Sequence, residues 1–328
     1  MDYKIGFFGV KSWEREAIER EIIRLPSFGV GIFEKEVQDD VELASKYDVI
    51  STFIYSNLTK DVLKKLPNLK MVAARSTGTD HVDCDECMKR SIVVKNVPEY
   101  GSRTVAEYAI ALMMAITKKI IPAHQSVEDG EFSPEGLTGI DLFGKTLGVV
   151  GVGKIGENVV KLGRALGMKV VGVERKRDEK LAKRLGFRYV ELEECLKIAD
   201  VISLHVPSIP ATYHLINKQN IKLMKKGSYL INTCRGPVVE SSALVWALNN
   251  KILAGVGLDV VEEENKVESI SVVMTDETKK SDLQDILSFH LLRDRDDVVM
   301  TPHNAFNTRE AIGRIVATTV DNIIQFIK

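Results

Sequence analysis

The chain has almost no excess of charge of either sign. Its 45 Lys and Arg residues are offset by 46 Asp and Glu residues, which leaves a formal net charge of −1. A general binding surface for nucleic acid or for an acidic membrane needs a basic excess. We therefore expect neither a nucleic acid nor a membrane as a partner.

Long apolar runs and a leader-like start are also lacking. The longest apolar candidate, residues 105–116, contains Glu107 and is far shorter than the about 20 residues that span a bilayer. The opening residues MDYKIGFFGV enter a strand-like run directly, without the basic start and apolar core of a signal peptide. We expect a cytoplasmic protein.

Cysteine is scarce, with four residues in the chain. Cys84 and Cys87 match C-x-x-C, a spacing that occurs in redox pairs and in halves of zinc sites. No second such pair and no nearby paired histidines complete four ligands. The segment DCDECMKRS instead favours a short polar helix, and no metal site is predicted.

The 328 residues suffice for two ordinary domains, and 45% hydrophobic with 28% charged residues is typical of globular proteins. Strand-like runs alternate with charged helical patterns, which predicts parallel α/β sheets. The strand candidates are Lys4–Val10, Val30–Phe33, Val49–Tyr55, Lys70–Ala74, Ile92–Asn96, Leu147–Val150, Val170–Val173, Asp200–His205, Ser228–Asn232, Ala254–Asp259 and Val298–Thr301.

Three segments depart from this alternation. Thr104 and Glu107 form a capping box that predicts a helix start, and the apolar run after it must be buried on nearly every side, within the fold or against another subunit. Residues 265–297 are charged, with one helix-like piece. A long amphipathic helix is expected over Thr308–Ile327.

The stretch from Leu147 to Glu174 is typical of a dinucleotide-binding unit. A buried strand is followed by G-x-G-x-x-G (151–156), a helix, a second strand and an acid 23 residues after Gly151. The glycines allow a tight turn and close approach to a pyrophosphate, and the helix N-terminus attracts the phosphates. Glu174 would accept hydrogen bonds from ribose hydroxyls and favour NAD over NADP, although the basic residues 175–177 follow it.

Four polar residues that follow predicted strands are candidates for chemistry. Arg235 is suited to a carboxylate, His303 to proton exchange, and Asp259 and Glu264 to tuning a neighbour. Each alone is more simply a surface arginine, a structural histidine or part of a solvated acidic loop. Their shared position at carboxyl ends of strands, where ligands bind in such sheets, favours a joint site.

These segments together resemble the D-2-hydroxyacid dehydrogenase family. The resemblance rests on GVGKIG (151–156), LHVP (204–207), INTCRG (231–236), GLDVVEEE (257–264) and TPHNAF (301–306), and extends to RSTGTDHVD (75–83) and PEYGSRTVAEYA (98–109). The segments FIYSNLT and HNAF and the charged insertion before His303 are most similar to the D-lactate dehydrogenase branch.

Carried over residue by residue, the resemblance implies NAD-dependent reduction of a 2-oxo acid to the (R)-2-hydroxy acid. Arg235 would hold the substrate carboxylate with the N–H groups of Thr77 and Gly78. His303 would donate the proton, and Glu264 would favour its charged form. The implied cofactor contacts are Gly151, Gly153, Lys154, Ile155, Gly156, Glu174, His205, Val206, Pro207, Thr233, Cys234 and Asp259, and the implied walls for the substrate side chain are Tyr55, Tyr100 and Phe306.

The resemblance also implies a domain plan of two Rossmann-like or flavodoxin-like doubly wound sheets with a cleft between them. Residues 1–101 and 302–328 would form a discontinuous substrate domain, and residues 102–301 an NAD-binding domain. The run 105–116 would lie in the helical interface of a homodimer. The chain departs from the family's usual residues at Thr79, Arg103, Cys234 and Asn307, which bears on substrate preference.

Other functions remain open at this point. The substrate could be glyoxylate, hydroxypyruvate or phosphite, or the protein could be an NAD(H)-sensing regulator. The intact set of Arg235, Glu264 and His303 argues against a purely regulatory protein. Glu264 also disfavours formate, because formate enzymes of this fold pair the catalytic His with Gln.

Overall fold

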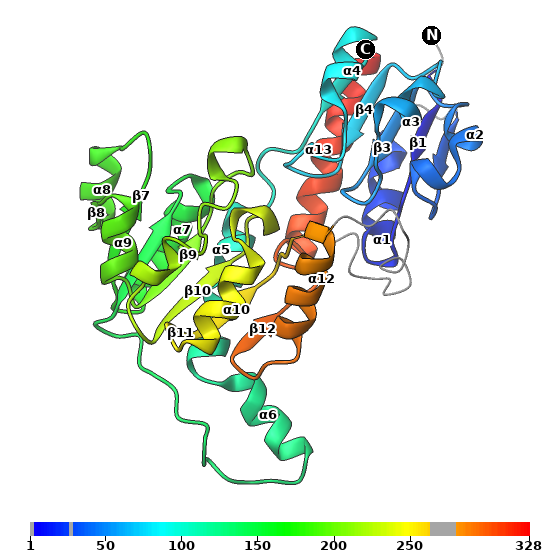
Figure 1. Ribbon diagram of the computed structural model, residues 1–328. Helices are drawn as coiled ribbons and strands as arrows, with labels where there is room; N and C mark the ends of the chain where they lie inside the picture. The colour runs from blue at the N-terminus through cyan, green and yellow to red at the C-terminus, as the bar shows by residue number, and fades with distance from the viewer. Residues whose placement is uncertain (1–2, 26–28, 263–279) are drawn as a thin grey trace. The chain divides into compact units, whose positions relative to one another are not determined.

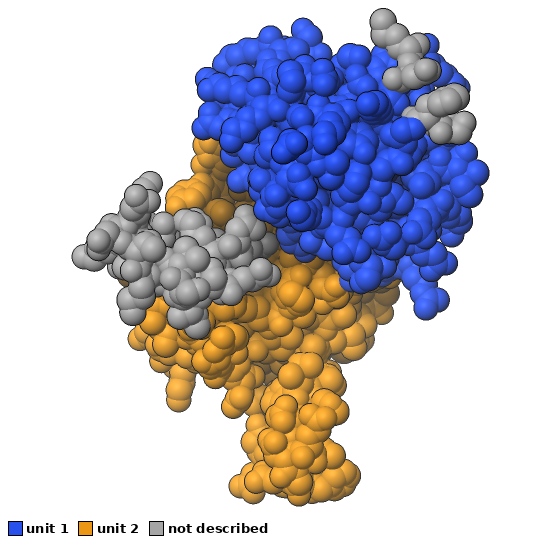
Figure 2. Space-filling view, turned by 90° about the vertical axis from the view of Figure 1, so that its right-hand side faces the viewer, with its two compact units in different colours: residues 1–101, 307–328 blue, residues 102–306 orange. Residues whose placement is uncertain are grey.

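The computed structural model describes residues 3–25, 29–262 and 280–328, and the chain divides into two compact units. Unit 1 joins residues 1–101 to residues 307–328, and unit 2 is residues 102–306 (Figure 2). Each unit has its own parallel sheet flanked by helices (Figure 1). The predicted class of two doubly wound α/β domains is confirmed.

Unit 1 is built on a five-stranded parallel sheet in the order β2-β1-β3-β4-β5. Its strands are β1 (Ile5–Phe7), β2 (Val30–Ile32), β3 (Val49–Thr52), β4 (Met71–Ala74) and β5 (Val93–Lys95), and its helices are α1 (Ser12–Glu21), α2 (Val41–Ala44), α3 (Lys60–Lys64), α4 (Cys84–Lys89) and α13 (Arg309–Ile327). The 3₁₀ helices η1 (Ile22–Arg24) and η2 (Val37–Asp39) complete its regular structure.

The last helix of the chain supplies part of the core of unit 1. One face of α13 buries Ile312, Val316, Val320 and Ile323 against the sheet and α1. Thr308 caps the N-terminus of the helix, since its hydroxyl accepts a 3.2 Å hydrogen bond from the N–H of Ala311. The predicted amphipathic helix over Thr308–Ile327 is therefore confirmed.

Unit 2 is built on a seven-stranded parallel sheet in the order β12-β11-β10-β9-β6-β7-β8. Its strands are β6 (Thr146–Val150), β7 (Lys169–Val173), β8 (Arg188–Tyr189), β9 (Val201–Leu204), β10 (Ser228–Asn232), β11 (Leu253–Leu258) and β12 (Val298–Met300). Its helices are α5 (Ser102–Thr117), α6 (Ile120–Glu128), α7 (Lys154–Ala165), α8 (Glu179–Leu185), α9 (Leu192–Ile198), α10 (Ser241–Asn249) and α12 (Lys280–Arg293), with 3₁₀ helices η3 (Pro210–Thr212), η4 (Ile221–Leu223) and η5 (Gly236–Val238).

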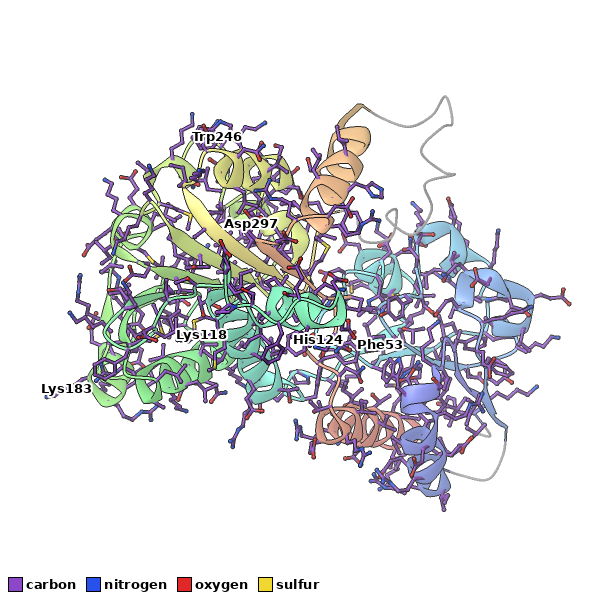
Figure 3. The ribbon with its side chains drawn as sticks, turned by 90° about the horizontal axis from the view of Figure 1, so that it is seen from below. Phe53, Lys118, His124, Lys183, Trp246 and Asp297 are labelled. Atoms are coloured by element: carbon purple, nitrogen blue, oxygen red, sulfur yellow. The ribbon has the colours of Figure 1, made fainter. Side chains whose placement is uncertain are left out.

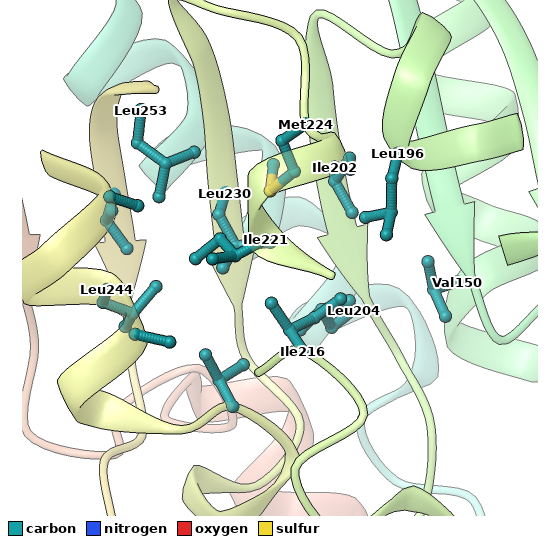
Figure 4. Packing of buried hydrophobic residues seen from close by; sticks show 14 of the residues in the cluster. Val150, Leu196, Ile202, Leu204, Ile216, Ile221, Met224, Leu230, Leu244 and Leu253 are labelled. Atoms are coloured by element: carbon teal, nitrogen blue, oxygen red, sulfur yellow. The ribbon is translucent and has the colours of Figure 1, made fainter. Parts of the chain in front are cut away.

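Helices cover both faces of this sheet. Helices α5, α7 and α8 pack on one face, where Leu112, Val159 and Ala182 are buried. Helices α9, α10 and α12 pack on the other, and Figure 4 shows Leu196, Leu230 and Leu244 in that core. In Figure 3, Lys183 on α8 and Trp246 on α10 lie at different margins of the unit. Coverage on both faces leaves the strand ends as the place for ligands.

The start of α5 corrects one prediction. The helix begins at Ser102, so Thr104 lies inside it and does not cap it. Glu107 pairs instead with Arg103 one turn earlier, at 2.7 Å. The expected capping box fails because the helix extends two residues further toward the N-terminus than the local pattern indicates.

Helix α5 is buried on one side only within the chain. Ala106, Ala109 and Leu112 are buried, whereas Met114 is 40% exposed. Helix α6, which follows directly, has no buried residue and extends away from the sheet of its unit (Figure 1). None of the helices that the structure describes is both long and apolar enough to cross a membrane.

Candidate active site

All strands of unit 2 run in the same direction, so the segments after them meet at one edge of the sheet. These segments are Gly151–Gly153 after β6, Glu174 after β7, His205 after β9, Thr233–Arg235 after β10, Asp259 after β11 and the 301–305 loop after β12. The chain leaves β6 toward β7 on one side and places β9 on the other. Ligands of open α/β sheets bind at such a reversal of strand order.

The glycine-rich turn at this reversal is fixed by close backbone contacts. Gly151 has φ +91°, and a Cβ there would lie 2.5 Å from the carbonyl oxygen of His205. A Cβ on Gly156 would lie 2.1 Å from the carbonyl oxygen of Gly151. Gly153, the residue before α7, faces open space and no described side chain caps the helix. The turn therefore presents a helix N-terminus to open space, which suits a phosphate.

Glu174 holds this turn from the end of β7. Its Oε2 accepts a 3.0 Å hydrogen bond from the N–H of Val152, and its Oε1 accepts one of 2.9 Å from the N–H of Arg175. Arg177 is drawn aside by an ion pair with Glu191. The carboxylate predicted to read the ribose therefore also fixes the turn that would bind the pyrophosphate.

Two buried polar atoms near the switch point have no partner among the described residues. They are Nδ1 of His205 and the hydroxyl of Thr233, which follow neighbouring strands. His205 Nε2 lies 2.8 Å from the hydroxyl of Ser203, and burial lowers the pKa of His205 to about 3. Because buried polar atoms are rarely left unsatisfied, this neutral imidazole and this hydroxyl fit a polar ligand.

The turn that carries Arg235 is held by the last residue of β10. The side-chain oxygen of Asn232 accepts from the N–H of Cys234 at 3.1 Å and from its thiol at 3.0 Å. The side-chain amide of Asn232 donates to the carbonyl oxygen of Arg235 at 3.1 Å. Burial raises the pKa of the Cys234 thiol to about 11. The sulfur is therefore a small neutral group beside a half-buried guanidinium.

Asp259 ties the His303 loop to the end of β11. Its Oδ1 accepts from the hydroxyl of Thr301 at 2.6 Å and from the N–H of Asn304 at 2.8 Å, and its Oδ2 accepts from the N–H of Ala305 at 2.8 Å. The N–H of His303 donates to the carbonyl oxygen of Asp259 at 2.9 Å. Asp259 is 1% exposed, and burial raises its pKa. His303 is thereby held at φ +49°, in the left-handed region.

Unit 1 also has polar groups at the carboxyl edge of its sheet. Among the described residues, the N–H groups of Thr77 and Gly78, after β4, have no acceptor. The hydroxyl of Thr77 donates to the carbonyl oxygen of Val97 at 2.9 Å and holds the turn. Free consecutive N–H groups in a turn form a concavity that binds anions.

Aromatic residues follow β3 at the same edge of unit 1. Phe53, labelled in Figure 3, packs edge-to-face with Trp13 and at a tilt against Tyr55, with ring centroids 5.5 Å and 5.6 Å apart. Tyr55 is 41% exposed, with the ammonium of Lys11 5.5 Å from its ring centroid. The carbonyl oxygen of Tyr100 accepts a 2.7 Å hydrogen bond from Arg314 on α13.

Comparison with known proteins identifies the family to which this chain belongs. Residues 110–305 match the model of the D-isomer specific 2-hydroxyacid dehydrogenase NAD-binding domain. The chain belongs to the D-2-hydroxyacid dehydrogenase family. It is 34% identical over 323 residues to a 2-hydroxyacid dehydrogenase homolog of Haemophilus influenzae, covering 98% of this chain and 95% of that protein.

Two further relatives bear on the substrate. A glyoxylate reductase of Thermococcus litoralis is 38% identical over 231 residues, covering 68% of this chain and 70% of that one. The D-lactate dehydrogenase of Aquifex aeolicus, solved with NAD and lactic acid, is 35% identical with a TM-score of 0.86, covering 99% of this chain and 95% of that one. The chain is therefore an NAD-dependent D-2-hydroxyacid dehydrogenase close to the D-lactate dehydrogenase branch.

The residues of this dehydrogenase fit its cofactor. The turn 151–156 has open space at Gly153 for a pyrophosphate, and Glu174 lies beside this turn at the end of β7. The buried atoms of His205 and Thr233 that lack partners among the described residues would offer polar contacts. The structure brings the loops of Arg235, Asp259 and His303 to one sheet edge. Phe306 is buried, at 6% exposed, and Glu264 lies outside the described residues.

Some residues that shape the dehydrogenase's site were not predicted. Asn232 and Thr301 hold the Arg235 turn and Asp259 through side-chain hydrogen bonds. For Asn232 the sequence has a signal, since an Asn that ends a strand before a turn commonly bonds the backbone two residues on. For Thr301 there is no local signal, because its partner is 42 residues away.

Proposed function

We propose that the physiological reaction is reduction of pyruvate to (R)-lactate with NADH. The observation that carries this is the pinning of the His303 loop by Asp259, at the same sheet edge as the Arg235 turn. A proton donor after β12 and a carboxylate-binding cation after β10, at the same sheet edge on either side of β11, suit a 2-oxo acid. Similarity to the Aquifex aeolicus enzyme, solved with lactic acid, supports the small side chain.

Each residue has a defined task in this reaction. Arg235 forms a two-pronged contact with the substrate carboxylate, since its planar guanidinium matches that group. The resemblance assigns a second anion-binding role to the N–H groups of Thr77 and Gly78. It assigns contacts with the substrate side chain to Tyr55, Tyr100 and Phe306.

The proton and the hydride come from different sources. When bound, NADH supplies a hydride to the 2-oxo carbon. The imidazolium of His303 donates a proton to the 2-oxo oxygen, which would otherwise become an alkoxide. Glu264 hydrogen-bonds His303 and favours its charged form; this assignment rests on the resemblance. The resemblance assigns contacts with the nicotinamide half to His205, Val206, Pro207, Thr233, Cys234 and Asp259.

Substrate choice is tested with the purified full chain. Steady-state rates are measured with pyruvate, 2-oxobutyrate, phenylpyruvate, glyoxylate and hydroxypyruvate, and the product chirality is determined by chiral chromatography. We expect the highest kcat/KM with pyruvate and an (R) product. A higher kcat/KM with glyoxylate would favour the alternative that the Thermococcus litoralis relative suggests. A His303→Gln variant should lose about a hundredfold or more in kcat.

We further propose a homodimer that works in the cytoplasm. Helix α6 and the segment after it expose Ile120, Ile121, Val127 and Phe132, the last at 94%, and exposed apolar surface of this kind marks a protein interface. All four cysteines are free thiols, as is usual in a reducing compartment. Light scattering during size exclusion should give twice the chain mass of 36.5 kDa.

A further inference from the structure

One histidine–carboxylate pair in unit 2 is largely buried and is formed by residues that have no role in the proposed reaction. Nε2 of His214 is 2.6 Å from Oε1 of Glu262, and Glu262 is 6% exposed. The other oxygen of Glu262 accepts a 2.7 Å hydrogen bond from the N–H of Ser241, the first residue of α10. A buried carboxylate with both oxygens bonded is held in one orientation.

The backbone of His214 is bonded to the segment that follows Arg235. His214 has φ +47°, and its N–H donates to the carbonyl oxygen of Pro237 at 2.8 Å. Ile216 continues this contact by donating to the carbonyl oxygen of Val238 at 3.1 Å. The ring of Tyr213 stacks on the imidazole at 4.0 Å and limits its movement. His214 is therefore fixed both by its main chain and by its ring.

The segment that follows Arg235 also lies directly against the segment that follows β11. A Cβ on Gly236 would lie 1.9 Å from the carbonyl oxygen of Val261 and 2.6 Å from the N–H nitrogen of Glu262. Only glycine permits this approach. Gly236 is the next residue after Arg235, and Glu262 precedes Glu264 by two residues. His214 thus bonds two segments that are already in van der Waals contact.

We propose that the His214–Glu262 pair is a positioning clamp, which sets the backbone carrying Arg235 against the segment that follows β11, up to Glu262. The inference rests on the proposed role of Arg235. A bidentate arginine contact is sensitive to position, and a misplacement of about 1 Å can cost on the order of a hundredfold in rate. None of the hydrogen bonds described for His214 and Glu262 goes to the glycine-rich turn at 151–156. Loss of the clamp should therefore affect the oxoacid far more than NADH.

The test compares two carboxylates at the same helix end. Glu262→Ala removes both bonds of the clamp. Glu240→Ala is the matched control, because Glu240 also lies at the N-terminus of α10 and accepts a 2.9 Å hydrogen bond from the N–H of Lys218 in the same connecting segment. Within the described part of the chain, its side chain bonds Lys218 and Ser242 and not the segment after β11. We expect Glu262→Ala to lower kcat/KM for pyruvate tenfold or more with KM for NADH within twofold, and Glu240→Ala to leave both within twofold.

A second variant keeps the test decisive if Glu262→Ala does not fold. His214→Asn tolerates the left-handed backbone but is too short to reach Glu262, which keeps its bond to Ser241. It should show the same selective loss for pyruvate, and the effect should be less than multiplicative with that of Arg235→Lys, because both changes disturb one contact.

The outcomes separate this inference from the proposed function. Pyruvate kinetics equal to those of the Glu240 control, or multiplicative effects with Arg235→Lys, would refute the clamp alone. An Arg235→Lys variant that leaves KM for pyruvate unchanged would refute the proposed role of Arg235, and the clamp with it.

Discussion

Replacing Asp259 by asparagine tests whether the His303 loop is held as the structure shows. The carboxylate accepts three hydrogen bonds, two at Oδ1 and one at Oδ2. An amide keeps one acceptor, so its NH₂ group must face at least one donor of the loop. The best orientation places the oxygen toward Thr301 and Asn304 and the NH₂ toward the N–H of Ala305.

The cost follows from those contacts. A hydrogen bond to a charged group contributes about 1.5–3 kcal/mol, and a buried donor without an acceptor costs about 1–3 kcal/mol. The neutral amide recovers part of this, because burial raises the pKa of Asp259 and so disfavours its charged form. We expect a net loss of about 2–4 kcal/mol, or on the order of 10 °C in the Tm of unit 2. The displaced His303 should lower kcat by on the order of a hundredfold.

The assay combines thermal unfolding by circular dichroism with steady-state pyruvate reduction. Asp200→Asn is the matched control, since Asp200 accepts from the N–H of Thr146 at 2.8 Å and from Lys225 at 2.6 Å at the amino edge of the same sheet. It should lower the Tm and leave kcat nearly unchanged. Parental kcat in Asp259→Asn, or an equal loss of kcat in Asp200→Asn, would contradict the reasoning.

Three further predictions concern individual side chains. Arg235→Lys keeps the charge but loses the planar, two-pronged guanidinium. In steady-state kinetics, KM for pyruvate should rise tenfold or more while KM for NADH stays within threefold. Equal rises in the two KM values would place Arg235 outside the substrate site. Glu174→Gln keeps an acceptor for the N–H of Val152 but removes the charge that repels a 2′-phosphate. The ratio of kcat/KM for NADH to kcat/KM for NADPH should therefore fall severalfold, and an unchanged ratio would assign cofactor choice to the basic residues 175–177. The Cys234 thiol has its pKa raised to about 11, so it forms a thiolate only as the pH rises well above neutrality. Its alkylation by iodoacetamide at pH 7.5, followed by mass spectrometry, should be on the order of a few hundredfold slower than that of free cysteine, and the rate should still rise about tenfold per pH unit near pH 9. A rate near that of free cysteine would contradict the burial of the thiol.

Elements with strong local patterns were predictable. The strand, turn, helix and second strand from Leu147 to Val173 follow from apolar runs and glycine spacing, and the structure has β6, α7 and β7 there. The last helix likewise begins after Thr308 as expected. The start of α5 was not predictable from the Thr104 capping pattern, because two more residues gain helical contacts in the fold.

The acidic run after β11 gives an example of a contact that sequence patterns over a few residues do not predict. Residues 262–264 are three consecutive glutamates, and the sequence alone does not predict that Glu262 is buried. The structure buries Glu262 against His214, 48 residues away, and the N-terminus of α10. Asp259 similarly finds its partners in the 301–305 loop. Both choices depend on which loops the sheet order brings together.

The sequence by itself determined the two doubly wound sheets, the dinucleotide turn and the residue types that suit a 2-oxo acid. These depend on hydrophobic period, glycine placement and side-chain chemistry, which act over a few residues. Only the tertiary structure decided that Glu174 holds the glycine-rich turn, that Asp259 pins the His303 loop and that Glu262 pairs with His214. Each of those contacts joins segments more than 20 residues apart, which only the packing of strands side by side brings within hydrogen-bond distance.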